Sequence, residues 1–140
     1  MKDLICAGAG AIGGVIAAAL GGWDTAIATL VTLMVVDYLS GVVCAGVFHK
    51  SRKTSSGSLK SNIGFKGLCK KCMVLCFVLV GQMIGQLVGS EYIRDAVIIG
   101  FSLNELISIV ENAGLMGLPI PSTVKRMIDV LQSAADKEAK

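Results

Sequence analysis

The sequence contains few of the side chains that enzymes use for chemistry. Charged residues make up only 16% of its 140 residues, aromatic residues 5%, and there is a single histidine. It also lacks a phosphate-binding loop, a nucleophile elbow and a zinc-binding helix motif. One C-x-x-C pair, Cys69 and Cys72, has no second pair of ligands, so it predicts no metal site. We therefore expect a protein that is not an enzyme and that binds no cofactor or metal.

Apolar residues, by contrast, make up 54% of the chain, and the mean hydropathy is +0.72. A soluble domain of this length could not bury so much apolar surface. A helix needs about 20 apolar residues to cross a bilayer core, and four runs are long enough: residues 4–22, 25–48, 72–90 and 96–118. These runs are longer than barrel strands and apolar on every side. The composition predicts an all-α integral membrane protein with about four transmembrane helices within residues 1–121.

The first apolar run also has features of a signal peptide. Lys2 precedes it, and Ala17, Ala18 and Ala19 are small residues of the kind found at a cleavage site. Cleavage would leave the new terminus outside, and the second helix would still enter the cytoplasm. The predicted orientation is therefore the same in both cases.

Residues 49–71, here called the basic segment, carry seven of the basic residues and no acidic residue. These are Lys50, Arg52, Lys53, Lys60, Lys66, Lys70 and Lys71. The positive-inside rule places such a segment in the cytoplasm. An even number of spans then puts both termini in the cytoplasm. The charges serve mainly to fix this topology; contact with membrane lipids is a second role, and nucleic acid is not an expected partner.

The last segment, residues 122–140, is predicted to form an amphipathic cytoplasmic tail. Pro119 and Pro121 end the fourth apolar helix, and Ser122 or Thr123 can cap a new one. Its apolar face is formed by Val124, Met127, Ile128 and Leu131. The tail would lie on the membrane, pair with copies of itself, or remain solvated.

Asp37 is the best single functional candidate because it lies in the middle of an apolar run. A carboxylate at mid-bilayer costs several kcal/mol, so Asp37 should face other helices. It could act in gating or assembly, or simply form a hydrogen bond to a neighbouring helix.

The fourth run carries a polar stripe on one side, which a helical plot places within a sector of about 120°. The stripe consists of Asn104, Glu105, Ser108, Glu111 and Asn112. Because no basic residue falls within a predicted span, we expect no ion-pair partner for either glutamate. The stripe should line water in an oligomer or form a dry polar packing face.

Glycines repeat every four residues along the third run, at Gly81, Gly85 and Gly89. This spacing lets two helix backbones approach closely and predicts tight helix pairing. Gly10 and Gly14 give the first run a similar ridge.

Several of these patterns together resemble the toxin-secretion and phage-lysis holin family. The residues that carry the resemblance are residues 36–41 (VDYLSG), residues 64–68 (GFKGL) with Lys70 and Lys71, residues 104–105 (NE) followed by residues 108–113 (SIVENA), and residues 117–121 (GLPIP). The resemblance covers most of the chain, with these motifs in the family's order and spacing.

The resemblance implies a multi-pass protein of the bacterial cytoplasmic membrane that forms homo-oligomers. Such a protein accumulates and then opens large lesions, through which an endolysin reaches the cell wall or a toxin is exported. The endolysin or toxin would be passing cargo. Two other classes stay open at this stage: a narrow cation channel or small transporter that uses Asp37, Glu105 and Glu111, and an antiholin-like inhibitor.

Overall fold

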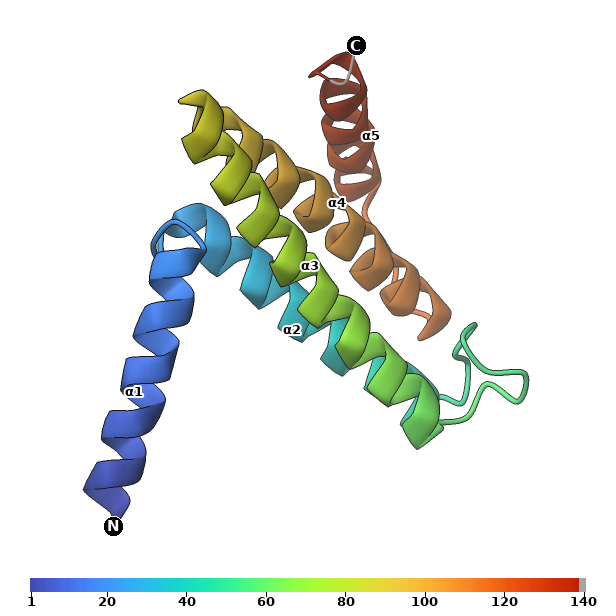
Figure 1. Ribbon diagram of the computed structural model, residues 1–140. Coiled ribbons are helices and arrows are strands. Elements are labelled where there is room, and N and C mark those ends of the chain that lie inside the picture. The colour runs from blue at the N-terminus through green and yellow to red at the C-terminus, as the bar shows by residue number, and fades with distance from the viewer. Residues whose placement is uncertain (139–140) are drawn as a thin grey trace.

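The computed structural model describes residues 1–138, and within them the chain forms five helices and no strand (Figure 1). The helices are α1 (Lys2–Ala19), α2 (Thr25–Gly46), α3 (Ser61–Val88), α4 (Tyr92–Leu115) and α5 (Ser122–Glu138). The all-helical prediction is confirmed. The last two residues of the predicted tail, 139–140, lie outside the described residues.

Three of the described helices, α1, α2 and α3, are long and apolar enough to cross a membrane. α4, which was predicted as a fourth span, is not among them. α3 begins at Ser61, so the second half of the basic segment, with Lys66, Lys70 and Lys71, is helical.

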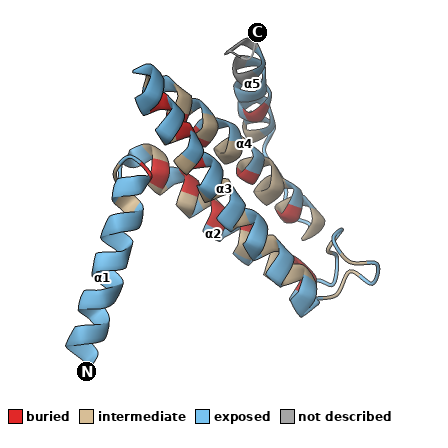
Figure 2. Ribbon diagram, in the orientation of Figure 1, coloured by how far each residue is buried: buried red, intermediate tan, exposed pale blue. Residues whose placement is uncertain are grey.

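α2, α3 and α4 lie side by side and form the packed part of the protein (Figure 1). The most extensive contact joins α2 to α4. The core between the helices consists of Leu20, Ile27, Leu30, Met34, Val78 and Ile98. α1 extends away from this bundle and has no buried residue, while α5 contacts α4 (Figure 2).

Two glycines of α3 allow tight packing at its C-terminal end. A Cβ atom on Gly81 would lie 3.2 Å from Val97 Cγ2, so this glycine permits the close approach of α3 and α4. A Cβ atom on Gly85 would lie 2.5 Å from the carbonyl oxygen of Ser90, where the chain turns toward α4. Gly89 ends α3 in the left-handed conformation, with φ of 70°.

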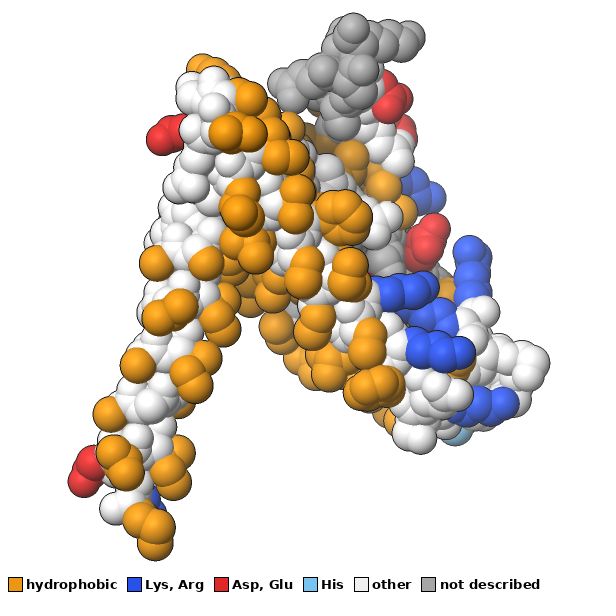
Figure 3. Space-filling model, viewed as in Figure 1, with side chains coloured by type: hydrophobic (Ala, Val, Ile, Leu, Met, Phe, Trp, Pro, Cys, Tyr) orange, Lys and Arg blue, Asp and Glu red, His pale blue; other side chains and the backbone are white. Residues whose placement is uncertain are grey.

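The exterior of the bundle is largely apolar. Large aliphatic and aromatic side chains cover the visible faces of α1 and α3, whereas lysines and arginines gather at the end where α2 leads into α3 (Figure 3). Phe65, Phe77 and Leu87, for example, are exposed on α3. An apolar exterior of this kind requires lipid as its solvent, which agrees with a membrane protein.

Candidate functional site

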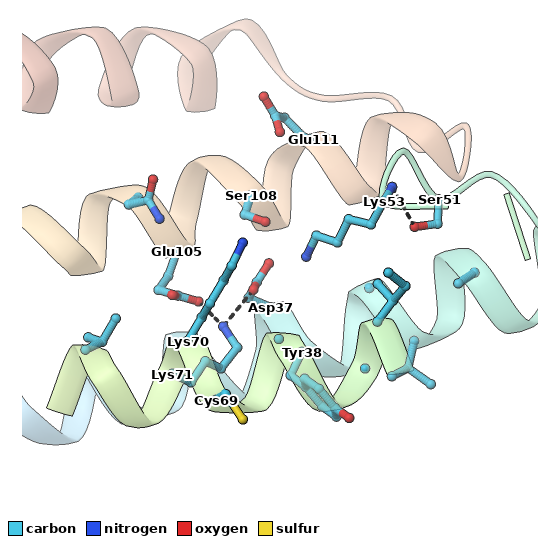
Figure 4. A pocket seen from close by; sticks show the side chains of 18 of the residues that line it. Asp37, Tyr38, Ser51, Lys53, Cys69, Lys70, Lys71, Glu105, Ser108 and Glu111 are labelled. Atoms are coloured by element: carbon cyan, nitrogen blue, oxygen red, sulfur yellow. Dashed lines mark hydrogen bonds and ion pairs between the residues drawn. The ribbon is translucent and has the colours of Figure 1, made fainter. Parts of the chain in front are cut away.

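Three charged side chains from three helices meet inside the bundle (Figure 4). The ammonium nitrogen of Lys71 on α3 lies 2.7 Å from Asp37 Oδ2 on α2 and 2.5 Å from Glu105 Oε2 on α4. The side chain of Lys71 is 12% exposed, and those of both carboxylates are 7% exposed. We call these three residues the ionic cluster.

The periodicity of each helix explains why these side chains point inward. Asp37 follows Leu30 and Met34 on the buried face of α2, at helical spacing. Lys71 lies seven positions before Val78 on α3, and Glu105 lies seven positions after Ile98 on α4. Residues seven positions apart share a helix face, so the apolar packing that buries the three helices also buries the three charges.

Neighbouring polar side chains complete the hydrogen bonding of Asp37. Asn112 Nδ2 donates to Ser40 Oγ at 2.9 Å and to Asp37 Oδ1 at 3.4 Å. Ser40 Oγ in turn donates to the backbone carbonyl of Asp37 at 2.9 Å. The hydrogen bonds therefore link α2 to α4 independently of Lys71.

The expectation that no cation is available to the carboxylates of the polar stripe is wrong for Glu105. Lys71 was assigned to a loop because it belongs to a run of basic residues, but it lies in the middle of α3 and pairs with Glu105. The signal that could have identified it is the heptad spacing from Val78 back along α3. The stability of the folded bundle should therefore depend strongly on Lys71, the one cation that the two carboxylates share. Removal of one partner from a buried ion pair costs about 3–5 kcal/mol.

The rest of the polar stripe lies at the margin of this cluster. Asn112 is buried, Ser108 is half-buried, and Asn104 and Glu111 are exposed. Except for Asn112, the stripe lines a cavity of about 730 Å³ between α2, α3, α4 and the loop that follows α2. Figure 4 shows Ser108 beside Asp37, with Glu111 farther along α4. In the single protomer Glu105 and Asn112 are thus covered by other protein segments, whereas Asn104 and Glu111 remain exposed at the edge of the stripe.

The basic segment divides into two groups around this cavity. Lys53, Lys60, Lys70 and Lys71 line it, whereas Lys50, Arg52 and Lys66 do not.

The glycines that were predicted to pack against another helix also fall into two groups. Gly81 and Gly85 contact α4 and the turn before it, but Gly10 and Gly14 on α1 have no neighbouring atom within 4 Å of an added Cβ.

Arg94, which the sequence did not single out, holds the turn between α1 and α2. Its Nε donates to the carbonyl of Leu20 at 2.7 Å, and its Nη2 donates to the carbonyl of Gly22 at 3.3 Å. Gly21 lies between them, and an added Cβ there would be 2.9 Å from Arg94 Nε. Arg94 therefore satisfies carbonyls that follow the end of α1, although it belongs to the first turn of α4.

The same guanidinium pairs with Asp24, the residue that caps α2. Arg94 Nη1 lies 2.7 Å from Asp24 Oδ2, and Asp24 Oδ1 accepts from the backbone N–H of Ile27 at 3.0 Å. The hydrogen bond from Arg94, followed by that from Ile27, holds the pKa of the Asp24 carboxyl below its usual value of 3.8. Asp24 therefore joins the start of α2 to the start of α4.

Comparison with known proteins gives a family match and several relatives. Residues 14–133 match the model of a family described as the bacteriophage holin family. An uncharacterized protein of Halalkalibacterium halodurans is 34% identical over 123 residues, which is 84% of this chain and 85% of the relative. An uncharacterized protein of Listeria innocua is 34% identical over 119 residues, 84% of this chain and 79% of the relative.

A third relative, from Clostridium perfringens, is described as an uncharacterized 14.9 kDa protein in the nagH 3′ region. It is 32% identical over 115 residues, which is 81% of each chain. No solved structure gives a significant match.

Proposed function

Because the chain belongs to the bacteriophage holin family, we propose that it oligomerises in the bacterial cytoplasmic membrane and opens lesions that large proteins can cross. The cargo would be an endolysin in host-cell lysis, or an exported protein such as a toxin. The single observation that carries the proposal is the ionic cluster, together with the polar stripe beside it, inside a bundle whose exterior is apolar.

Charged and amide groups within a bilayer must be buried against protein or face water. In the single protomer, Lys71 neutralises part of the charge of Asp37 and Glu105, and Ser40 accepts a hydrogen bond from Asn112. This arrangement gives a form that is compatible with lipid. In an assembled lesion, α4 would turn its stripe toward water. Asp37 and Glu105 would then no longer require Lys71 as their counter-ion.

The membrane topology that fits this proposal has four spans, α1 to α4, with both termini in the cytoplasm. α4 would be the span that is stable in lipid only while its polar stripe is covered. The amphipathic helix α5, which contacts α4 in the structure, would lie on the cytoplasmic side. Asp37, which contacts both α3 and α4, would set the threshold for opening.

Assembly would use the remaining free helix surfaces. α1 has no buried residue in the protomer, so its ridge with Gly10 and Gly14 is available to a second copy. Gly81 and Gly85 already contact other parts of the protomer, so we propose that copies meet through α1 rather than through this part of α3.

The test is induced expression in a bacterial host that also makes an endolysin without a secretion signal. Culture turbidity and the release of a large cytoplasmic enzyme are recorded together. We expect abrupt lysis that requires both proteins and a simultaneous release of the enzyme. Growth arrest with leakage of ions but no release of the enzyme would contradict the proposal and indicate a narrow channel; absence of any effect would indicate an inhibitor.

A further inference from the structure

The cavity next to the ionic cluster has one charged side and one apolar side. Its polar lining comes from the loop after α2, from α3 and from the polar stripe of α4. Its apolar lining includes Val42, Ala45, Leu59, Ile63, Phe77 and Phe101. A volume of about 730 Å³ is within the usual range for small-molecule sites. The cavity therefore suits a ligand that has both a polar and an apolar part.

The charges of the lining indicate the sign of the polar part. Four lysines line the cavity (Lys53, Lys60, Lys70 and Lys71) against three carboxylates (Asp37, Glu105 and Glu111), which leaves one positive charge in excess. Lys71 is occupied by the ionic cluster. In the part of the chain that the structure describes, the other three lysines form no salt bridge. A ligand with a single negative charge would balance the lining.

Two of the lysines that line the cavity come from different segments of the chain. Lys53 belongs to the loop after α2 and Lys70 belongs to α3 (Figure 4). Two ammonium groups thus line one cavity together with the hydroxyl group of Ser108. A phosphate ester accepts hydrogen bonds from ammonium and hydroxyl groups of this kind.

We propose that this cavity binds the phosphodiester headgroup of an anionic phospholipid, with Lys53 and Lys70 as its main ligands and an acyl chain along the apolar wall. Part of the lining comes from the loop after α2, at the end of the bundle where basic residues gather (Figure 3), and in the proposed topology this end lies at the level of the headgroups. A polyanion such as nucleic acid is disfavoured, because the three carboxylates repel further negative charge. The inference requires membrane insertion but not lesion formation.

The experiment uses the full chain purified in detergent and native mass spectrometry with short-chain phosphatidylglycerol or phosphatidylcholine. The test variant is Lys53→Gln with Lys70→Gln. The matched control is Lys50→Gln with Lys66→Gln, which removes the same charge from the same loop and the same helix but at positions that do not line the cavity. We expect wild type and control to retain one phosphatidylglycerol, and the test variant to bind it roughly twentyfold more weakly.

Four further results decide the proposal. Lys53→Arg with Lys70→Arg should restore the bound lipid, since the charge is kept. Equal loss in the test and control variants would overturn the proposal in favour of general attraction to the basic segment, as would equal binding of the two lipids by wild type. Displacement of the lipid by inorganic phosphate alone would overturn the lipid assignment and leave a free-anion site.

Discussion

The ammonium nitrogen of Lys71 lies between two carboxylates, 2.7 Å from Asp37 on α2 and 2.5 Å from Glu105 on α4. One residue of α3 thereby joins three helices, and the residues it joins are 34 positions away in each direction. These contacts help to fix how α2, α3 and α4 pack against one another. They also give the protein a polar interior that lipid alone could not accommodate.

Loss of the Lys71 charge should destabilise the bundle. Lys71→Met leaves Asp37 and Glu105 buried without a cation, which should cost about 3–5 kcal/mol. Lys66→Met, an exposed position on the same helix, should change stability little. The measurement is thermal unfolding in detergent, followed by circular dichroism. If Lys71→Met unfolds at the same temperature as the control variant, the cluster contributes nothing to stability.

Neutralising the carboxylates together with Lys71 should restore most of the stability that Lys71→Met alone loses. The combination Lys71→Met, Asp37→Asn and Glu105→Gln removes all three charges, and replacement of a whole buried charge cluster is often neutral or stabilising. We expect unfolding within a few degrees of wild type. A triple variant as unstable as Lys71→Met alone would show that the loss arises from packing rather than from unpaired charge.

Asp37 should control the time at which lesions form. Asp37→Asn weakens the link to Lys71 but leaves a side chain of similar size, so the protomer should open more readily and lysis should begin earlier after induction. The time is read from culture turbidity, at protein levels matched by immunoblot. If the variant lyses cells at the same time as wild type, Asp37 does not act in gating.

Two glycines should respond in opposite directions to alanine. Gly85→Ala places a Cβ 2.5 Å from the carbonyl oxygen of Ser90, so the turn into α4 must shift, at a cost of about 1–3 kcal/mol. Gly100→Ala meets no atom within 4 Å and should gain up to about 1 kcal/mol of helix propensity. Thermal unfolding of the two variants tests the difference. Equal effects would mean that the turn is not tightly packed.

Acid should weaken the connection between Asp24 and Arg94. The pKa of Asp24 is lower in the folded protein than its usual value of 3.8. Its contribution to stability is therefore complete above pH 3.8 and is lost as the pH falls below that value, through the folded pKa. Asp24→Asn should unfold at a lower temperature than wild type above this window, and the difference should shrink within it. A difference that is constant with pH would contradict the role assigned to the Asp24 charge.

Much of the secondary structure could be predicted from hydropathy. The apolar runs at residues 25–48 and 96–118 correspond closely to α2 and α4, because an apolar run between polar or glycine-rich turns has few alternatives to a helix. The start of α3 could not be found in this way. Residues 61–71 are rich in lysine, and a span predicted from hydropathy begins only where the charges end.

Which side chains pair with one another was harder to predict from the sequence than where the helices lie. Asp37 and Glu105 stood out because they interrupt apolar or amphipathic patterns, but Lys71 was one of seven similar charges. Arg94 pairs with Asp24 across 70 positions and with two backbone carbonyls, and no local pattern marks such partners. Which charges meet depends on how the helices pack against one another, and periodicity within a single helix does not contain that information.

Exposure to water, in the lesion, of the polar face that is buried in the protomer is the step on which the proposed mechanism depends. It can be tested with a chain in which the five cysteines are replaced by alanine and a single cysteine is introduced. Asn112→Cys tests the buried face, Ile99→Cys an exposed apolar position on α4, and Lys50→Cys an exposed position in the loop that does not line the cavity. Labelling by a membrane-permeant maleimide is followed before and after the onset of lysis, since the thiolate that reacts forms in water.

We expect Asn112→Cys to be protected before onset and labelled after it, while Ile99→Cys stays protected and Lys50→Cys is labelled throughout. Protection of Asn112→Cys after the cells have lysed would show that another surface lines the hole.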